Sequence, residues 1–464
     1  MSPSQASLHL LPAEILHLIC RELCYHCKAE AFSQYPQKDA RRATPSPSQA
    51  WMNWVALDRR EAYRALISLS EACRSLYKFV LPYLWHYVDL QAHQELGVAL
   101  FLRNTDDRPD WTALVSSLTL APKLLWPKAG GQRSLDMAKQ RNMIGQENSL
   151  EGRNALPKMV LRGLLLDLLL SMMPNISQLR IRPENDTFYG RFLPGSTKFE
   201  SLRYLHMEDP TRSGGSLFEC DLNRVETLFD KAPNLETLVI KVGKLSWSSS
   251  PGQSHLGNLR CLKLVDCLVP PTQLERLIKP CTQLESFILI SHLQVEDSTT
   301  LQTLPKALSA RQQTLCYLEI FWFIQPDDRS TSPSDSIIGS LKDFTSLETL
   351  ILGGPSARLE SDEEGNPPSD SLINLLPPSI HSVCIEGQQL LYEPMVALAA
   401  AAKQGSFPKL RYFGHTQLDI EKISYTHDSL GELTKGTKIS FRDHPRSVFP
   451  KCPWDSGYGP SAIL

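Results

Sequence analysis

The chain has 464 residues, with 48 basic and 50 acidic side chains and a formal net charge of −2 at pH 7. This length exceeds one ordinary hydrophobic core, so we expect either several domains or an elongated array of repeats. The near-neutral charge gives no support to nucleic-acid binding.

Cysteine usage and hydropathy point to the inside of the cell. The 11 cysteines are odd in number and scattered, unlike the dense framework of a small secreted domain. Glu14 interrupts the N-terminal apolar run that could serve in a signal peptide. The apolar stretch 161–173 contains Arg162 and Asp167 and is too short to cross a bilayer. We therefore expect a soluble cytoplasmic or nuclear protein that does not contact membranes.

The first predicted element is a helix of about three turns that begins near Pro12. A proline in the first turn costs little, because its missing amide would have had no partner there. Glu14 lies in the same turn, where the helix dipole favours a carboxylate. The following apolar residues share one stripe: Ile15, Leu16, Ile19 and Leu23.

A second amphipathic helix is predicted further along the chain. One of its faces carries Leu66, Leu69, Cys73 and Leu76. Neither helix is long enough to be stable alone, so the two must pack on each other and on something else.

Segments 11–19, 65–76 and 84–88 together resemble the two halves of an F-box. The resemblance implies a helical module at residues 8–90 that binds a Skp-type adaptor and, through it, a cullin. The residues that it implies for adaptor binding are Leu11, Pro12, Ile15, Leu16, Ile19, Leu23, Leu66, Leu69, Cys73 and Leu76.

The segment between the two halves departs from the family pattern, in which a few residues usually join the helices. Here residues 28–60 intervene, and 36–49 are rich in Pro, Ser and Arg. This composition is typical of a surface loop or a disordered insertion. Its sparse basic cluster, Lys38, Arg41 and Arg42, favours a solvated loop over a nuclear localisation signal.

From about residue 115 onward, Leu-x-x-Leu-x-Leu or a close variant recurs. Between Leu179 and Phe413 the middle residues of successive copies are 24 to 33 residues apart, which is in or just above the range of leucine-rich repeats. The clearest middle residues are Leu205, Leu238, Leu262, Phe287, Leu318 and Leu350, and weaker copies centre on Leu118, Leu179, Val383 and Phe413.

The segments between the copies have helical spacing. They are 224–230, 272–278, 303–309, 336–342 and 394–403. A helix between successive strands demands parallel pairing and a right-handed crossover. We therefore predict an α/β fold in which residues 91–440 form an irregular solenoid, with strands on the concave face and helices on the convex face. A conventional doubly wound α/β domain is the alternative.

The repeat region resembles the irregular leucine-rich repeats often found behind F-boxes in fungal proteins. The copy at 259–267 also has the family's cysteine at the turn after the strand, Cys267. Stretches 128–156, 246–254, 325–336 and 353–370 are predicted to be loops on the rim. The Pro-rich residues 441–464 are predicted to form either a cap or a loose tail.

The sequence contains none of the usual catalytic motifs. It lacks a nucleophile elbow, a phosphate-binding loop, a His-Glu-x-x-His motif and a dinucleotide-binding fingerprint. We therefore expect no enzyme activity and no cofactor. Cys24-x-x-Cys27 has the spacing of zinc ligands, with Cys20, His17 and His26 nearby. A second pair of ligands does not follow, so the sequence favours buried thiols over a metal site.

These resemblances imply the substrate-recognition subunit of a Skp/cullin/F-box ubiquitin ligase, with a protein substrate bound to the repeats. An alternative is a non-catalytic repeat scaffold whose degenerate F-box no longer engages the adaptor. A hydrolase or transferase on an α/β fold is a third alternative. It would need a polar pocket, and no spacing of residues in the sequence indicates one.

The predicted substrate surface is the ladder of residues that face the concave side between the core leucines. The alternative is that a rim loop or the C-terminal tail folds over this ladder. The ladder residues would then be ordinary core residues. The ladder residues are Arg180, Arg182, Val239, Lys241, Lys263, Val265, Ile288, Ile290, Glu319, Phe321 and Ile351.

Overall fold

The computed structural model describes residues 8, 11–24, 27, 61, 63–90, 95–120, 136, 140, 143, 158–181, 190–208, 219–247, 256–291, 299–322, 338–353, 368–386, 392–416, 435 and 439–442. The insertion predicted at 28–60 and the tail beyond residue 442 lie outside these residues. The chain divides into two compact units: the first comprises 1–181, 187–203 and 453–464, and the second comprises 182–186 and 204–452.

The first unit contains three parallel strands, with helices before the first strand and between successive strands. Strand β2 pairs in parallel with β1 on one side and with β3 on the other. The bounds are α1 Ala13–Leu23, α4 Arg74–His86, β1 Tyr87–Asp89, α5 Glu95–Asp107, α6 Pro109–Thr112, β2 Ser117–Leu120, α8 Lys158–Ser171 and β3 Gln178–Ile181.

The second predicted helix is interrupted. Residues 63–72 are helical, but Cys73 adopts an extended conformation with φ −163° and ψ 161°, and α4 begins directly after it. The prediction of one continuous helix through Leu76 is therefore wrong. Because Cys73 breaks the helix, the spacing that placed Leu66, Leu69 and Leu76 on one face does not describe this segment.

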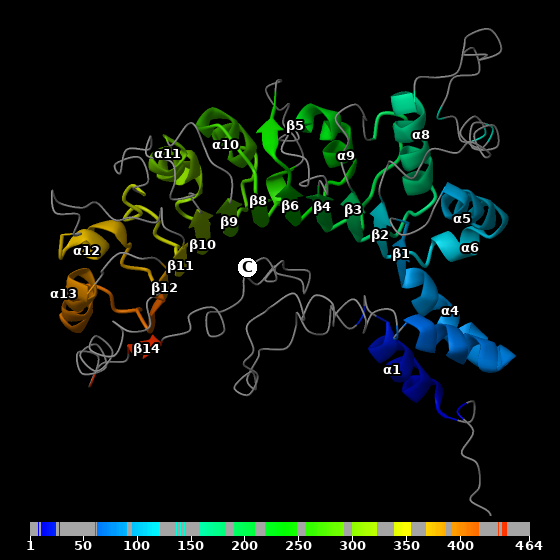
Figure 1. The fold of residues 1–464 in the computed structure, drawn as a ribbon, viewed down its shortest axis with the longest axis horizontal. Coiled ribbons are helices and arrows are strands. Elements are labelled where there is room, and N and C mark those ends of the chain that lie inside the picture. Colours follow the sequence, from blue (N-terminus) through cyan, green and yellow to red (C-terminus); the bar gives the residue numbers. More distant parts are fainter. Residues whose placement is uncertain are drawn as a thin grey trace, which may run out of the picture. The chain divides into compact units, whose positions relative to one another are not determined.

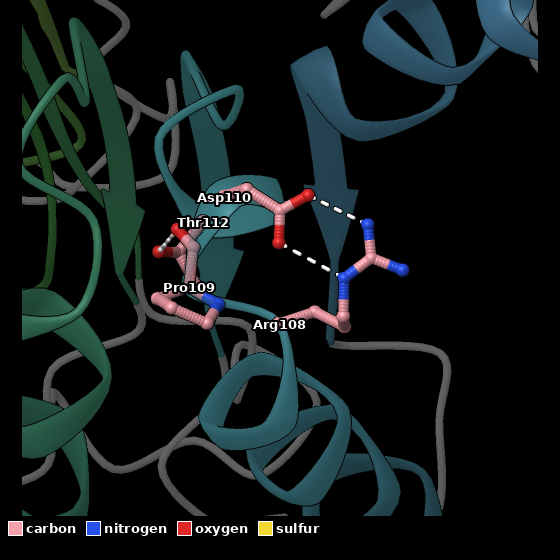
Figure 2. A network of polar contacts seen from close by, with 4 residues as sticks. All are labelled: Arg108, Pro109, Asp110 and Thr112. Atoms are coloured by element: carbon pink, nitrogen blue, oxygen red, sulfur yellow. Dashed lines mark hydrogen bonds and ion pairs between the residues drawn. The ribbon is translucent and has the colours of Figure 1, made fainter.

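A polar turn leads from α5 into the short helix α6 (Figure 2). The Arg108 guanidinium donates two hydrogen bonds to the Asp110 carboxylate, from Nε to Oδ1 at 3.0 Å and from Nη2 to Oδ2 at 2.6 Å. These hydrogen bonds lower the pKa of the Asp110 carboxyl. The same guanidinium lies 4.3 Å from the centroid of the Trp111 ring. That ring contacts the Trp85 ring of α4 at 5.1 Å between centroids, so the turn and α4 are joined through aromatic packing.

A buried carboxylate on α8 holds the loop that follows β3. Asp167 is fully buried, and it accepts hydrogen bonds from the backbone amides of Gly190 at 2.7 Å and Phe192 at 2.8 Å. Gly190 has φ 79°, in the left-handed region that glycine adopts without strain. Asp167 thus interrupts an apolar helix because the neighbouring loop needs a buried acceptor.

We expect Asp167→Ala to reduce the free energy of unfolding by about 3 kcal/mol, because one buried and one half-buried backbone amide would lose their charged acceptor. The measurement is urea denaturation of the full chain. Asp110→Ala is the matched control: it removes a carboxylate whose partner is exposed, and it should leave the transition almost unchanged. Equal transitions for Asp167→Ala and the unmutated chain would contradict this role.

The second unit is an α/β arrangement built on parallel strands. Its main sheet has the order β4-β6-β8-β9-β10-β11-β12-β13-β14, and β5 and β7 form a separate parallel pair. The strand bounds are β4 Tyr204–Glu208, β5 Glu219–Asp221, β6 Thr237–Lys241, β7 Lys244–Ser246, β8 Cys261–Val265, β9 Ser286–Ser291, β10 Tyr317–Trp322, β11 Thr349–Gly353, β12 Ser382–Glu386, β13 Tyr412–Thr416 and β14 Ser440–Arg442.

The register of this sheet follows the sequence repeat. The middle residues of successive copies pair with one another from Leu205 on β4 to Phe413 on β13. Each of them is buried. A buried leucine, phenylalanine or valine at the same position of each strand from β4 to β13 in the main sheet therefore forms a continuous apolar row, and the predicted parallel pairing is confirmed.

The connecting helices lie on the same side of the strands (Figure 1). They are α9 Glu226–Lys231, α10 Pro271–Ile278, α11 Thr299–Leu308, α12 Ser371–Leu375 and α13 Tyr392–Lys403, with short 3-10 turns at Leu222–Arg224, Leu256–Asn258 and Ser309–Arg311. Four of the five predicted helical segments overlap these elements. The fifth, 336–342, is wrong, since its described residues 338–342 are not helical. Helix α12 lies just after a predicted rim loop and was missed, because it has little more than one turn.

Candidate functional site

Helix α1 begins where the sequence predicts. Pro12 occupies the N-cap position with φ −53° and ψ 146°, and its carbonyl accepts hydrogen bonds from the amides of Ile15 and Leu16. Glu14 lies in the first turn. The helix ends at Leu23, where the amide of Cys24 still bonds to the carbonyl of Cys20.

One face of α1 packs into a small core. Leu16 and Cys20 are buried, and Cys20 joins a cluster with Cys24, Cys27, Leu66 and Val80. Partly buried Leu23, Leu69, Tyr83 and Leu84 pack against this cluster. The core therefore joins α1, the helical segment 63–72 and α4, and it fixes how α1 is presented.

The opposite face of α1 is apolar and exposed. Leu11, Ile15 and Leu18 are 36%, 42% and 54% exposed. Ile15 and Leu18 are three positions apart, which places them on one side of the helix, and Leu11 directly precedes the N-cap residue Pro12. Leu8, just before the helix, is also exposed. We call Leu11, Ile15 and Leu18 the outer face of α1.

Exposed large apolar side chains are concentrated in this module. Within the described residues there are seven: Leu8, Leu11, Ile15, Leu18, Tyr63, Tyr77 and Tyr412. All but Tyr412 belong to residues 8–77. Scattered exposed apolar residues are ordinary, but a concentration on one short segment is typical of an interaction surface.

The residues predicted for adaptor binding separate into two sets. Leu16, Leu66 and Leu76 are buried, and Ile19, Leu23, Leu69 and Cys73 are half-buried, so these residues mainly hold the module together. Leu11, Pro12 and Ile15 are exposed. The predicted single stripe Ile15, Leu16, Ile19 and Leu23 is therefore wrong: neighbours Ile15 and Leu16 lie about 100° apart around the helix and face different surroundings. Leu18 belongs to the outer face and was not selected from the sequence.

Three potential metal ligands meet where α1 and α4 end. The Sγ atoms of Cys24 and Cys27 lie 4.0 Å and 3.3 Å from Nδ1 of His86. Both thiols are buried and His86 is half-buried. The sequence indicates the two cysteines but not His86, because His86 follows Cys27 by 59 residues and only the packing of α4 on α1 brings it close.

The surroundings of these thiols differ. The pKa of Cys24 is lowered to about 4, first by a hydrogen bond from the Cys27 thiol and then by His86, against the opposing effect of burial. Burial raises the pKa of Cys20. Close by, His17 Nδ1 and the Tyr83 hydroxyl are hydrogen-bonded at 3.1 Å, and the Tyr83 and His86 rings lie 5.2 Å apart. The surroundings thus shift the pKa of Cys24 and the pKa of Cys20 in opposite directions.

The predicted substrate ladder lies on neighbouring strands of the second unit and is mostly buried. Lys263, Ile288, Glu319 and Ile351 are in register on β8 to β11, with Val239 beside Lys263 on β6. The buried members are Val239, Lys263, Val265, Ile288, Phe321 and Ile351, whereas Lys241, Ile290 and Glu319 are half-buried. Arg180 is half-buried on β3 in the first unit, and Arg182 lies outside the described residues.

The half-buried members carry the polar contacts of this face. Lys241 Nζ donates to Glu208 Oε1 at 3.0 Å, and the Tyr317 hydroxyl donates to Glu319 Oε2 at 2.7 Å. The ladder is therefore a largely covered apolar surface with polar groups at a few positions. Its accessible candidates in the second unit are Lys241, Ile290 and Glu319.

No family model matches the chain, and no curated protein matches it significantly. Among the described residues, no helix is both long enough and apolar enough to cross a membrane.

Proposed function

We propose that this protein is the substrate-recognition subunit of a Skp/cullin/F-box ubiquitin ligase. The observation that carries the proposal is the outer face of α1, where Leu11, Ile15 and Leu18 are exposed on a helix that a core of its own holds in place. A small module that leaves several large apolar side chains in solvent is suited to bury them against a partner. The resemblance of residues 11–19 to an F-box supports a Skp-type adaptor as that partner.

In this proposal the second unit is a leucine-rich-repeat-like solenoid that presents a protein substrate. The in-register row of core leucines and the single layer of helices support it. No residue of the chain performs chemistry. The ligase accelerates ubiquitin transfer because tethering raises the effective concentration of substrate lysines near a ubiquitin-loaded conjugating enzyme.

The test is direct binding between the purified full chain and a Skp-type adaptor. We expect a one-to-one complex in size-exclusion chromatography, and we expect a cullin to join it only when the adaptor is present. A chain that is folded, as judged by its melting transition, but elutes apart from the adaptor at micromolar concentrations would overturn the proposal.

A repeat scaffold that does not engage the adaptor is the second candidate. The feature that favours it is the insertion 28–60, which separates α1 from the helical segment 63–72. A loop of this length is compatible with docking, because the entropy cost of closing a loop grows only slowly with its length.

We expect deletion of residues 28–49 to leave the melting temperature nearly unchanged, because their composition is that of a solvated loop. Differential scanning calorimetry of the full chain and the deletion variant measures this. A loss of several degrees would show that the segment packs on the folded protein. Adaptor binding gained only by the deletion variant would favour the scaffold for the natural chain.

A further inference from the structure

The cluster of Cys24, Cys27 and His86 has the composition and shape of a metal site. Its ligand atoms, two thiol sulfurs and one imidazole nitrogen, all lie within 4.8 Å of one another. Among the described residues it is the only such group of three or more His, Cys, Asp or Glu side chains. The three residues come from the end of α1, the residues just after it and the last position of α4.

The observed distances fit a tetrahedral ion. Zinc binds cysteine sulfur at about 2.3 Å and histidine nitrogen at about 2.0–2.1 Å, so ligand atoms at tetrahedral corners are about 3.4–3.8 Å apart. Cys27 Sγ and Cys24 Sγ lie 3.3 Å and 4.0 Å from His86 Nδ1, on either side of this range. An ion therefore requires only small movements of these side chains.

The chemistry of the donors selects the metal. Two thiolates and one imidazole suit zinc and disfavour the hard cations magnesium and calcium, which take oxygen ligands. The Cys-x-x-Cys spacing lets two successive thiols share one ion. A thiolate is the form of cysteine that binds metal, so binding an ion would release the protons of both thiols.

We propose that Cys24, Cys27 and His86 bind a Zn²⁺ ion that fastens the end of α1 to the end of α4. The cluster supplies three ligands, so the fourth tetrahedral position is left to a ligand outside it. The core that joins these helices is small, so an ion bound across them supplies much of the stability of the module. The inference concerns the module's own stability and is independent of the proposed ligase function.

The first measurement is the metal content of the full chain purified under reducing conditions without chelator. We expect about one zinc per chain, and we expect Cys24→Ser, Cys27→Ser and His86→Gln each to lower the content at least tenfold. Cys73→Ser is the matched control: it removes a half-buried thiol of the same module that is not part of the cluster, and zinc should be retained.

Two further readouts keep the test decisive if a variant folds poorly. Replacing zinc by Co²⁺ in the unmutated chain should give the charge-transfer absorption of thiolate–cobalt bonds, and a chelator should lower the melting temperature of this chain but not that of Cys24→Ser. A chain that contains no zinc and takes none up under reducing conditions would overturn the proposal, as would zinc retained by all three variants. A Cys24–Cys27 disulfide that persists in protein purified under reducing conditions would also overturn it.

Discussion

Adaptor binding is expected to fall by two orders of magnitude or more when Leu11, Ile15 and Leu18 are changed together to alanine. These side chains are already partly exposed, so their truncation removes little of the module's core. Burying a large apolar side chain at an interface contributes about 1.5–3 kcal/mol, and each 1.4 kcal/mol is a tenfold change in affinity. Isothermal titration of the adaptor into the full-length variant measures the loss.

Two controls separate binding from folding. Tyr412→Ala truncates an exposed apolar side chain on β13, far along the sequence from the module, and should leave adaptor affinity unchanged. Leu16→Ala truncates the buried neighbour of Ile15 and should cost about 2–5 kcal/mol of stability. Wild-type affinity in a folded triple variant would exclude the outer face of α1 as the docking surface.

The leucine spacing predicted most of the second unit because a parallel strand buried on both faces needs apolar residues at fixed positions. Leu238, Leu262 and Phe287 each stand in the middle of a repeat copy, and the structure pairs them across the sheet. The spacing did not predict the shortest helices and strands. Helix α12 and the small pair β5–β7 have too few residues to show a period.

The candidate sites were predicted less completely, because they depend on which side chains meet in space. Periodicity placed Ile15 and Leu16 on one apolar stripe, but only the packing of α1 on α4 shows that Leu16 is core and Ile15 is exposed. His86 reaches Cys24 and Cys27 through the same packing. A single sequence contains no signal for a contact across 59 residues that no regular spacing marks.

The ladder on the second unit differs from the outer face of α1 because its central members are already covered. Ile288 and Phe321 are 2% and 1% exposed. The Phe321 ring occupies the space beside its register partner Gly353, where an added Cβ atom would lie 1.9 Å from the ring. Glycine at that position makes room for the ring. These residues therefore act as core, and a substrate reaching this face contacts the half-buried members first.

We accordingly expect Ile288→Asp and Phe321→Asp each to abolish the cooperative unfolding transition of the second unit. Removing a buried Ile or Phe side chain costs about 2–5 kcal/mol, and burying an unpaired carboxylate adds several more, which together match the whole stability of a typical domain. Thermal unfolding followed by circular dichroism measures this.

Ile290→Asp is the matched control, because it makes the same substitution two residues along the same face of β9 at a half-buried position. It should remain folded at a cost of a few degrees, and in that folded state it tests the substrate surface: impaired binding of a copurifying substrate would assign docking to this face. Unchanged melting of Ile288→Asp and Phe321→Asp would instead show that the ladder is open to solvent and that the central residues are themselves available to a partner.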